Sequence, residues 1–186
     1  AAGARFTNLI LPNVYGEGGK PFYNSAVHTF CYQLANGQSP KIIQDNEMEI
    51  IHAQRVARAI HAAIASPGDG EIVLAGRRIT VSRLLAKLGH MANLYSNGTI
   101  PDMRMPDELD LFNTYRAYLF PQKYPVNMTM RQTTHGGLVD AVTSLTGGQV
   151  YITTASSGVT RGGHYHTRKV ERLQVVSGKA LLRIRR

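Results

Sequence analysis

The sequence has almost no cysteine and no long apolar run. Cys31 is the only cysteine among 186 residues, so no disulfide can form within the chain. This fits a reducing compartment, and we expect a cytoplasmic protein. No apolar run reaches the roughly eighteen residues of a membrane-spanning helix, so we expect no membrane partner. The first residues also lack the charged segment, apolar core and cleavage site of a secretory signal.

An initiator methionine is absent as well, and the chain ends on Arg-Ile-Arg-Arg inside a strand-like run. We therefore expect a fragment of a longer protein. The hydrophobic share of 43% and the charged share of 18% are those of a globular protein that buries a core. The length suits one ordinary domain or two small ones.

Basic residues are in excess, and the excess is unevenly placed. The net charge is +9, and residues 126–186 alone hold nine Lys or Arg against two acidic residues, a net charge of +7. Such a patch attracts polyanions. It has no interleaved aromatics and no nucleic-acid motif, so we expect no nucleic-acid partner. A solvated strand face and a site for an anionic ligand remain as explanations of the charge.

Residues 1–120 alternate between strand-like and helix-like patterns, which predicts an α/β fold. Short apolar runs predict strands at residues 6–11, 48–52 and 71–74. Apolar residues at helical spacing predict a helix capped by Asn24 or Ser25, one over residues 54–65, one capped by Thr80 and one over residues 107–119. Cys31 lies on the apolar stripe of the first helix, so we interpret it as a buried hydrophobe and not a catalytic thiol.

The pattern changes after residues 121–125, whose two prolines forbid a continuing helix and indicate a linker. Short β-rich runs follow at residues 150–154, 170–176 and 180–184, separated by glycine-containing turns. We therefore expect residues 126–186 to form antiparallel strands only. The fold class predicted for the whole chain is α/β followed by all-β.

The strongest chemical signal is a histidine pair followed by a glutamate. His164 and His166 would point to the same face of a strand, and Glu171 would share the interior face of the next strand. A carboxylate among inward-pointing apolar groups needs a partner, and a metal ion supplies one. Two imidazoles and one carboxylate suit Fe(II), Mn, Ni, Co or Zn, and of these metals we expect Zn. The other histidines have no ligand spacing and are expected to be surface or satisfied core residues: His28, His52, His61, His90 and His135.

The spacing from Gly158 through His164, His166 and Glu171 to Gly178 matches the first cupin motif throughout. The resemblance implies that residues 126–186 are the first half of a cupin β-barrel. Cupins normally supply a further histidine from a second motif, which this chain does not contain. The alternative is a barrel that kept the motif and lost the metal.

The segment running from Arg5 to Asn13-Val14-Tyr15-Gly16 resembles the same stretch of extended short-chain dehydrogenases, which have a Rossmann-type fold. Residues 19–25 and Phe30-Cys31 resemble a narrower group. These are the two-domain UDP-sugar enzymes of capsule and O-antigen synthesis, on the route to UDP-N-acetyl-L-fucosamine, which end in a cupin. The resemblance implies that residues 1–120 are the C-terminal, substrate-binding part of a dehydrogenase domain.

In that group the cupin epimerises C3 of a UDP-4-keto-6-deoxy-N-acetylhexosamine, and the dehydrogenase domain reduces C4 with NADPH. The resemblance implies a UDP-sugar substrate contacted by Asn13, Lys20 and Asn24, and a homodimer. It assigns no catalytic residue to this chain. The alternatives are another metal-dependent cupin enzyme, such as a sugar ketoisomerase or dioxygenase, and a non-catalytic cupin that serves interaction or dimerisation.

Two departures from the group bear on these expectations. Dehydrogenases of this type need a glycine-rich dinucleotide turn and a Tyr-x-x-x-Lys pair, and neither occurs in residues 1–120. We expect both in a segment that precedes Ala1, so the chain as given should neither bind NADPH nor reduce a keto-sugar. In addition, the group often has Tyr-x-Asp-Asp where this chain reads His52-Ala-Gln-Arg55.

Overall fold

The computed structural model describes residues 5–66, 68 and 70–184. It has four helices within this part, namely α1 (Ala26–Ala35), α2 (Ala53–Ala65), α3 (Val81–Ser96) and α4 (Pro106–Ala117). The strands are β1 (Thr7–Ile10), β2 (Asn13–Tyr15), β3 (Glu47–His52), β4 (Gly70–Val73), β5 (Arg77–Thr80), β6 (Thr99–Ile100), β7 (Arg131–Thr133), β8 (Gly136–Ser144) and β9 (Gln149–Thr153). None of the described helices is long and apolar enough to cross a membrane.

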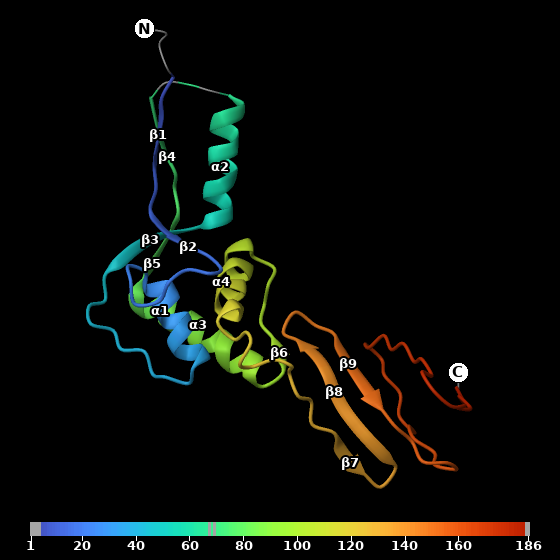
Figure 1. Cartoon of the computed structure of the whole chain (residues 1–186). Helices are drawn as coiled ribbons and strands as arrows, with labels where there is room; N and C mark the ends of the chain where they lie inside the picture. Colours follow the sequence, from blue (N-terminus) through green and yellow to red (C-terminus); the bar gives the residue numbers. More distant parts are fainter. Residues whose placement is uncertain (1–4, 67, 69, 185–186) are drawn as a thin grey trace.

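The chain forms an elongated molecule with three successive regions (Figure 1). At one end β1 and β4 pair in parallel, with α2 beside them. In the middle β3 pairs in parallel with β2 and antiparallel with β5, next to α1, α3 and α4. At the other end β8 pairs with β6, β7 and β9. The mixed α/β architecture expected for the first part is confirmed.

The core lies among α1, α3, α4 and the β2-β3-β5 sheet. Leu84, Leu88 and Leu111 are fully buried there, and Cys31 is buried beside them with 0% exposure. Burial raises the pKa of the Cys31 thiol, so the thiolate needed for nucleophilic chemistry is disfavoured. The interpretation of Cys31 as a small buried hydrophobe is therefore confirmed.

The helix starts follow the capping residues expected from the sequence. The hydroxyl of Ser25 accepts a hydrogen bond from the backbone N–H of His28 at 3.5 Å, and the hydroxyl of Thr80 accepts one from Arg83 at 3.2 Å. Each satisfies a backbone donor that the first turn of a helix leaves free. Asp107 and Glu108 lie in the first turn of α4, where acidic groups interact favourably with the positive end of the helix dipole.

Glycine is required at one position in the loop that joins β2 to α1. A Cβ atom on Gly19 would lie 2.0 Å from the ring of His28, too close for any side chain. The His28 ring fills this space because its Nε2 lies 3.0 Å from the carbonyl oxygen of Gly16. The glycine-rich turn is therefore shaped by a buried imidazole.

The region after the predicted linker contains strands and no helix among residues 126–184. β8 is antiparallel to β7 and β9, with an irregularity between Asp140 and Val142. The described strands of residues 126–184 therefore pair only antiparallel with one another, as expected, but β6, from the first part, adds a parallel partner at Thr143 and Ser144 of β8. The sheet thus includes two residues that precede the predicted linker.

Two predicted strands, over residues 170–176 and 180–184, are not formed. Residues 154–184 contain no strand and run as an irregular chain beside β9 (Figure 1). The apolar side chains of this segment are exposed, with Leu173 at 72% and Val176 at 93%. A strand exists only when a neighbouring strand accepts its backbone hydrogen bonds. Composition indicated the propensity for strands here, but no described strand supplies the pairing.

Candidate functional sites

Asn13 and Asn24, two predicted substrate contacts, line the same surface cavity. The cavity has a volume of about 430 Å³ and is lined by Leu11, Pro12, Asn13, Val14 and Asn24. The side-chain amide of Asn13 donates a hydrogen bond to the backbone oxygen of Glu49 on β3, at 3.1 Å. This contact fixes the amide at the start of β2, where its carbonyl oxygen is available to a ligand. The pairing of β2 with β3 therefore positions Asn13 at the cavity.

Lys20, the third predicted substrate contact, is not among the residues that line this cavity. Its ammonium lies 5.7 Å from the centre of the Tyr23 ring, within the range of a cation–π contact. The structure thus brings two of the three predicted substrate residues together, and it places Lys20 against an aromatic ring of its own loop.

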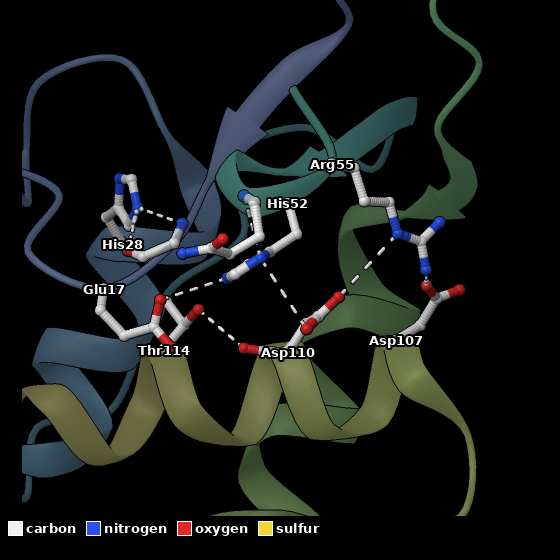
Figure 2. A network of polar contacts seen from close by, with 9 residues as sticks. Glu17, His28, His52, Arg55, Asp107, Asp110 and Thr114 are labelled. Atoms are coloured by element: carbon white, nitrogen blue, oxygen red, sulfur yellow. Dashed lines mark hydrogen bonds and ion pairs between the residues drawn. The ribbon is translucent and has the colours of Figure 1, made fainter. Parts of the chain in front are cut away.

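A network of polar side chains connects the loop after β2 with α2 and α4 (Figure 2). His52 is its centre and is only 4% exposed. Its Nδ1 accepts a hydrogen bond from the backbone N–H of Gln54 at 3.3 Å and so caps α2. With Nδ1 as acceptor, Nε2 carries the proton and donates to Glu17 at 3.2 Å. Asp110 lies on the other side, 3.8 Å from Nδ1.

The first turn of α4 is held by basic side chains from three other elements. Arg55 of α2 forms an ion pair with Asp107. Glu108 accepts hydrogen bonds from Lys87 of α3 at 2.6 Å and from Arg77 of β5 at 3.1 Å. Burial alone would raise the pKa of Glu108, but the bonds from Lys87 and Arg77 outweigh it and hold the pKa below its ordinary value. This network fixes the position of α4 against the central sheet.

This network was not predicted from the sequence. His28 and His52 were expected to be either surface or satisfied core residues, and the second alternative holds, since both are buried with hydrogen-bond partners. The signal that pointed here was the departure at His52-Ala-Gln-Arg55, because two of its three changed residues, His52 and Arg55, are members of the network. The ion pair between Arg55 and Asp107 joins positions 52 apart in the chain, a distance over which no local pattern operates.

The side chains of His164, His166 and Glu171 converge, as expected. One potential ligand atom from each lies within 4.8 Å of the other two. Nε2 of His166 is 3.5 Å from Oε1 of Glu171, and the two imidazole centres are 4.9 Å apart. Two nitrogen donors and one carboxylate match the preference of divalent transition metals and leave further coordination positions open. The donor set therefore fits a metal ion, and metal binding itself stays a prediction.

The route by which these residues meet differs from the one expected. Residues 158–171 form no strand, so a shared strand face does not align His164 with His166. An irregular segment brings the rings together, with positive φ angles at Gly158, Gly162 and Gly163. Only glycine adopts such angles freely, so these glycines allow the chain to bend around the histidines.

Lys169 is a fourth member of this cluster. Its Nζ lies 2.5 Å from Oε1 of Glu171 and 6.0 Å from the centre of the Tyr151 ring on β9. The hydrogen bond from Lys169 lowers the pKa of the Glu171 carboxyl, which keeps it ionised. Lys169 and Tyr165 also have the Tyr-x-x-x-Lys spacing. They do not lie on a helix, where that spacing would place the two side chains side by side.

Comparison with known proteins identifies relatives of both parts of the chain. Residues 1–76 match the NAD dependent epimerase/dehydratase family, and residues 131–186 match the polysaccharide biosynthesis C-terminal domain. A UDP-2-acetamido-2,6-beta-L-arabino-hexul-4-ose reductase from Pseudomonas aeruginosa is 29% identical over 181 residues. That alignment covers 94% of this chain and 48% of the relative, so the chain spans about half the length of the curated protein it matches.

Solved structures agree on the fold. The capsular polysaccharide assembling protein CapF from Staphylococcus aureus matches with a TM-score of 0.75 and 23% identity, over 86% of this chain and 45% of that protein. UDP-glucose 4-epimerase from Thermotoga maritima matches with a TM-score of 0.50 and 20% identity, over 60% of this chain and 45% of that one. This chain joins a segment that matches the epimerase/dehydratase family to a segment that matches the polysaccharide biosynthesis C-terminal domain. It is a homologue of nucleotide-sugar reductase/epimerase proteins, so the resemblance that the motifs indicated is confirmed.

Proposed function

We propose that this chain is part of a bifunctional nucleotide-sugar enzyme. Its cupin-like part would invert C3 of a UDP-4-keto-6-deoxy-N-acetylhexosamine, and a dehydrogenase domain would then reduce the C4 ketone with NADPH. The observation that carries the proposal is the similarity to the Pseudomonas reductase, which extends over 94% of the chain and includes both parts. Because the chain spans 48% of that relative, the proposal concerns a longer protein that contains this chain.

The chemistry of C3 inversion sets the requirements for the cupin-like part. The hydrogen at C3 lies next to the C4 ketone, so its removal places negative charge on the ketone oxygen, which fixed donors or cations stabilise. His164, His166 and Glu171 would hold a divalent ion, with Zn²⁺ as the first choice. When bound, such an ion supplies Lewis-acid stabilisation of that oxygen, or it has only a structural role and stabilises the surrounding chain. Both roles use the same three side chains.

The cavity beside β2 is the proposed contact surface for the UDP-sugar. Its volume of about 430 Å³ falls within the range typical of small-molecule sites. The amides of Asn13 and Asn24 offer both donors and acceptors to sugar hydroxyls or the N-acetyl group. Leu11, Pro12 and Val14 provide the apolar rim. A homodimer and a cytoplasmic location are also part of the proposal.

Substitution of the cavity asparagines tests the substrate assignment. In calorimetric titrations of the chain with UDP-N-acetylglucosamine, Asn13→Ala and Asn24→Ala are each expected to weaken binding by about 2- to 10-fold, the effect of one lost hydrogen bond. Asn127→Ala, an exposed asparagine in the other part of the chain, is the control and should bind like the wild type. NADPH should give no saturable signal with any of these proteins.

A wild-type chain that does not bind the UDP-sugar, or an Asn13→Ala variant with unchanged affinity, contradicts the placement of the substrate. Thermal unfolding of each variant separates a lost ligand contact from a damaged fold. This check matters for Asn13, because its amide also bonds to Glu49.

A further inference from the structure

The oxygen of Glu171 that faces His166 is already shared. Oε1 is the carboxylate atom 3.5 Å from Nε2 of His166, and the same Oε1 lies 2.5 Å from Nζ of Lys169. A divalent cation bound between the His166 imidazole and the carboxylate oxygen that faces it would meet the oxygen that Lys169 holds. Two cations on one carboxylate oxygen repel each other, so the ion and the ammonium group compete for it.

Lys169 has a second possible contact, the ring of Tyr151. Its side chain is 47% exposed, and a lysine ammonium is a point charge on a flexible four-carbon stem. Nζ lies 6.0 Å from the centre of the Tyr151 ring, at the outer limit of a cation–π contact. Tyr151 belongs to β9, so the ring is anchored in the sheet and not in the irregular segment that carries the histidines. A small rotation of the stem would exchange the carboxylate for the ring face.

We propose that Lys169 controls the affinity of the metal site by competing with the divalent cation for Glu171, and that it moves to the face of Tyr151 when the cation binds. The inference rests on the proposed metal site and adds a residue that none of the ligand motifs includes. It sets an affinity lower than the three ligands alone would give. Lys169 therefore acts on the metal site through Glu171 and is not itself a ligand.

Zinc affinity of the chain, measured by competition with a chromogenic chelator at fixed pH, tests the proposal. Lys169→Gln is expected to bind Zn²⁺ about 1.5- to 5-fold more tightly than the wild type, the range set by the strength of an exposed ion pair. Lys169→Arg keeps the charge and should behave like the wild type. Lys179→Gln removes the same charge from an exposed lysine that forms no ion pair with another described residue, and it should change the affinity far less. Tyr151→Leu should weaken Zn²⁺ binding in the wild type and have no effect in Lys169→Gln.

The outcomes separate this inference from the proposed function. If His166→Ala abolishes Zn²⁺ binding but Lys169→Gln binds no more tightly than the wild type, the metal site stands and the role of Lys169 is wrong. An equal gain in Zn²⁺ affinity in Lys179→Gln would mean that the effect comes from net charge alone. That result would also overturn the role of Lys169. If neither the wild type nor Lys169→Gln binds Zn²⁺, the site and the inference both fail.

Discussion

Replacement of His166 by alanine is expected to reduce the affinity of the chain for Zn²⁺ by at least about 100-fold. Loss of a residue that only supports a metal ligand already costs about 10- to 100-fold, and His166 is proposed as a ligand itself. Its Nε2 is the imidazole atom next to the Glu171 carboxylate, so its removal takes away one of three converging donors. Metal content by mass spectrometry after dialysis, together with the chelator titration, measures the effect.

His135→Ala is the matched control for this substitution. His135 is an exposed histidine in the turn between β7 and β8, and it lies in the same basic part of the chain. Its loss should leave the Zn²⁺ content unchanged. Equal metal content in the His166→Ala and wild-type proteins would mean that this motif does not form the metal site. No metal in either protein would favour a cupin that serves only as a scaffold.

Leu111→Ala is expected to destabilise the helical region by about 2–5 kcal/mol. Leu111 is fully buried on α4, and truncation of a core leucine removes transfer free energy and leaves a cavity. Urea unfolding followed by far-ultraviolet circular dichroism measures the change. The control is Leu109→Ala on the same helix, because Leu109 is 42% exposed and its truncation should cost much less. Similar losses in the two variants would contradict the packing of α4 described here.

The helices could be predicted because their determinants are local. Ser25 and Thr80 each cap a helix whose apolar residues recur at helical spacing, and both signals lie within one or two turns of the helix start. α3 buries Leu84, Leu88 and Met91, which recur at helical spacing along one face of the helix. Local agreement between caps and periodicity was sufficient for these elements.

Of the strands of the second part, the one expected at residues 150–154 is confirmed as β9 (Gln149–Thr153), but the others could not be predicted in the same way. β8 is the longest strand, but it begins with two glycines and was missed, whereas the apolar run at residues 170–176 was predicted and forms no strand. β6 is two residues long and pairs with a segment more than forty positions away. Strand formation depends on distant partners, and a single sequence carries no direct record of them.

The candidate sites were predictable to the extent that motifs fix them. The spacing from His164 to Glu171 predicted which side chains meet, although the chain brings them together without a strand. The same spacing gave no indication that Lys169 would hold Glu171.

Tyr124, inside the predicted linker, has its hydroxyl 3.2 Å from that of Tyr95 and packs against the core. The boundaries at residues 120 and 126 therefore stay a prediction.

The most direct test of the proposed function is solvent deuterium incorporation at C3. The longer protein that contains this chain would be incubated in D₂O with a UDP-4-keto-6-deoxy-N-acetylhexosamine and NADPH, and the product examined by nuclear magnetic resonance. C3 inversion through removal and return of a proton predicts an inverted C3 that carries deuterium, with NADPH consumed as C4 is reduced. A C4-reduced product that retains its original hydrogen and configuration at C3 would contradict the account.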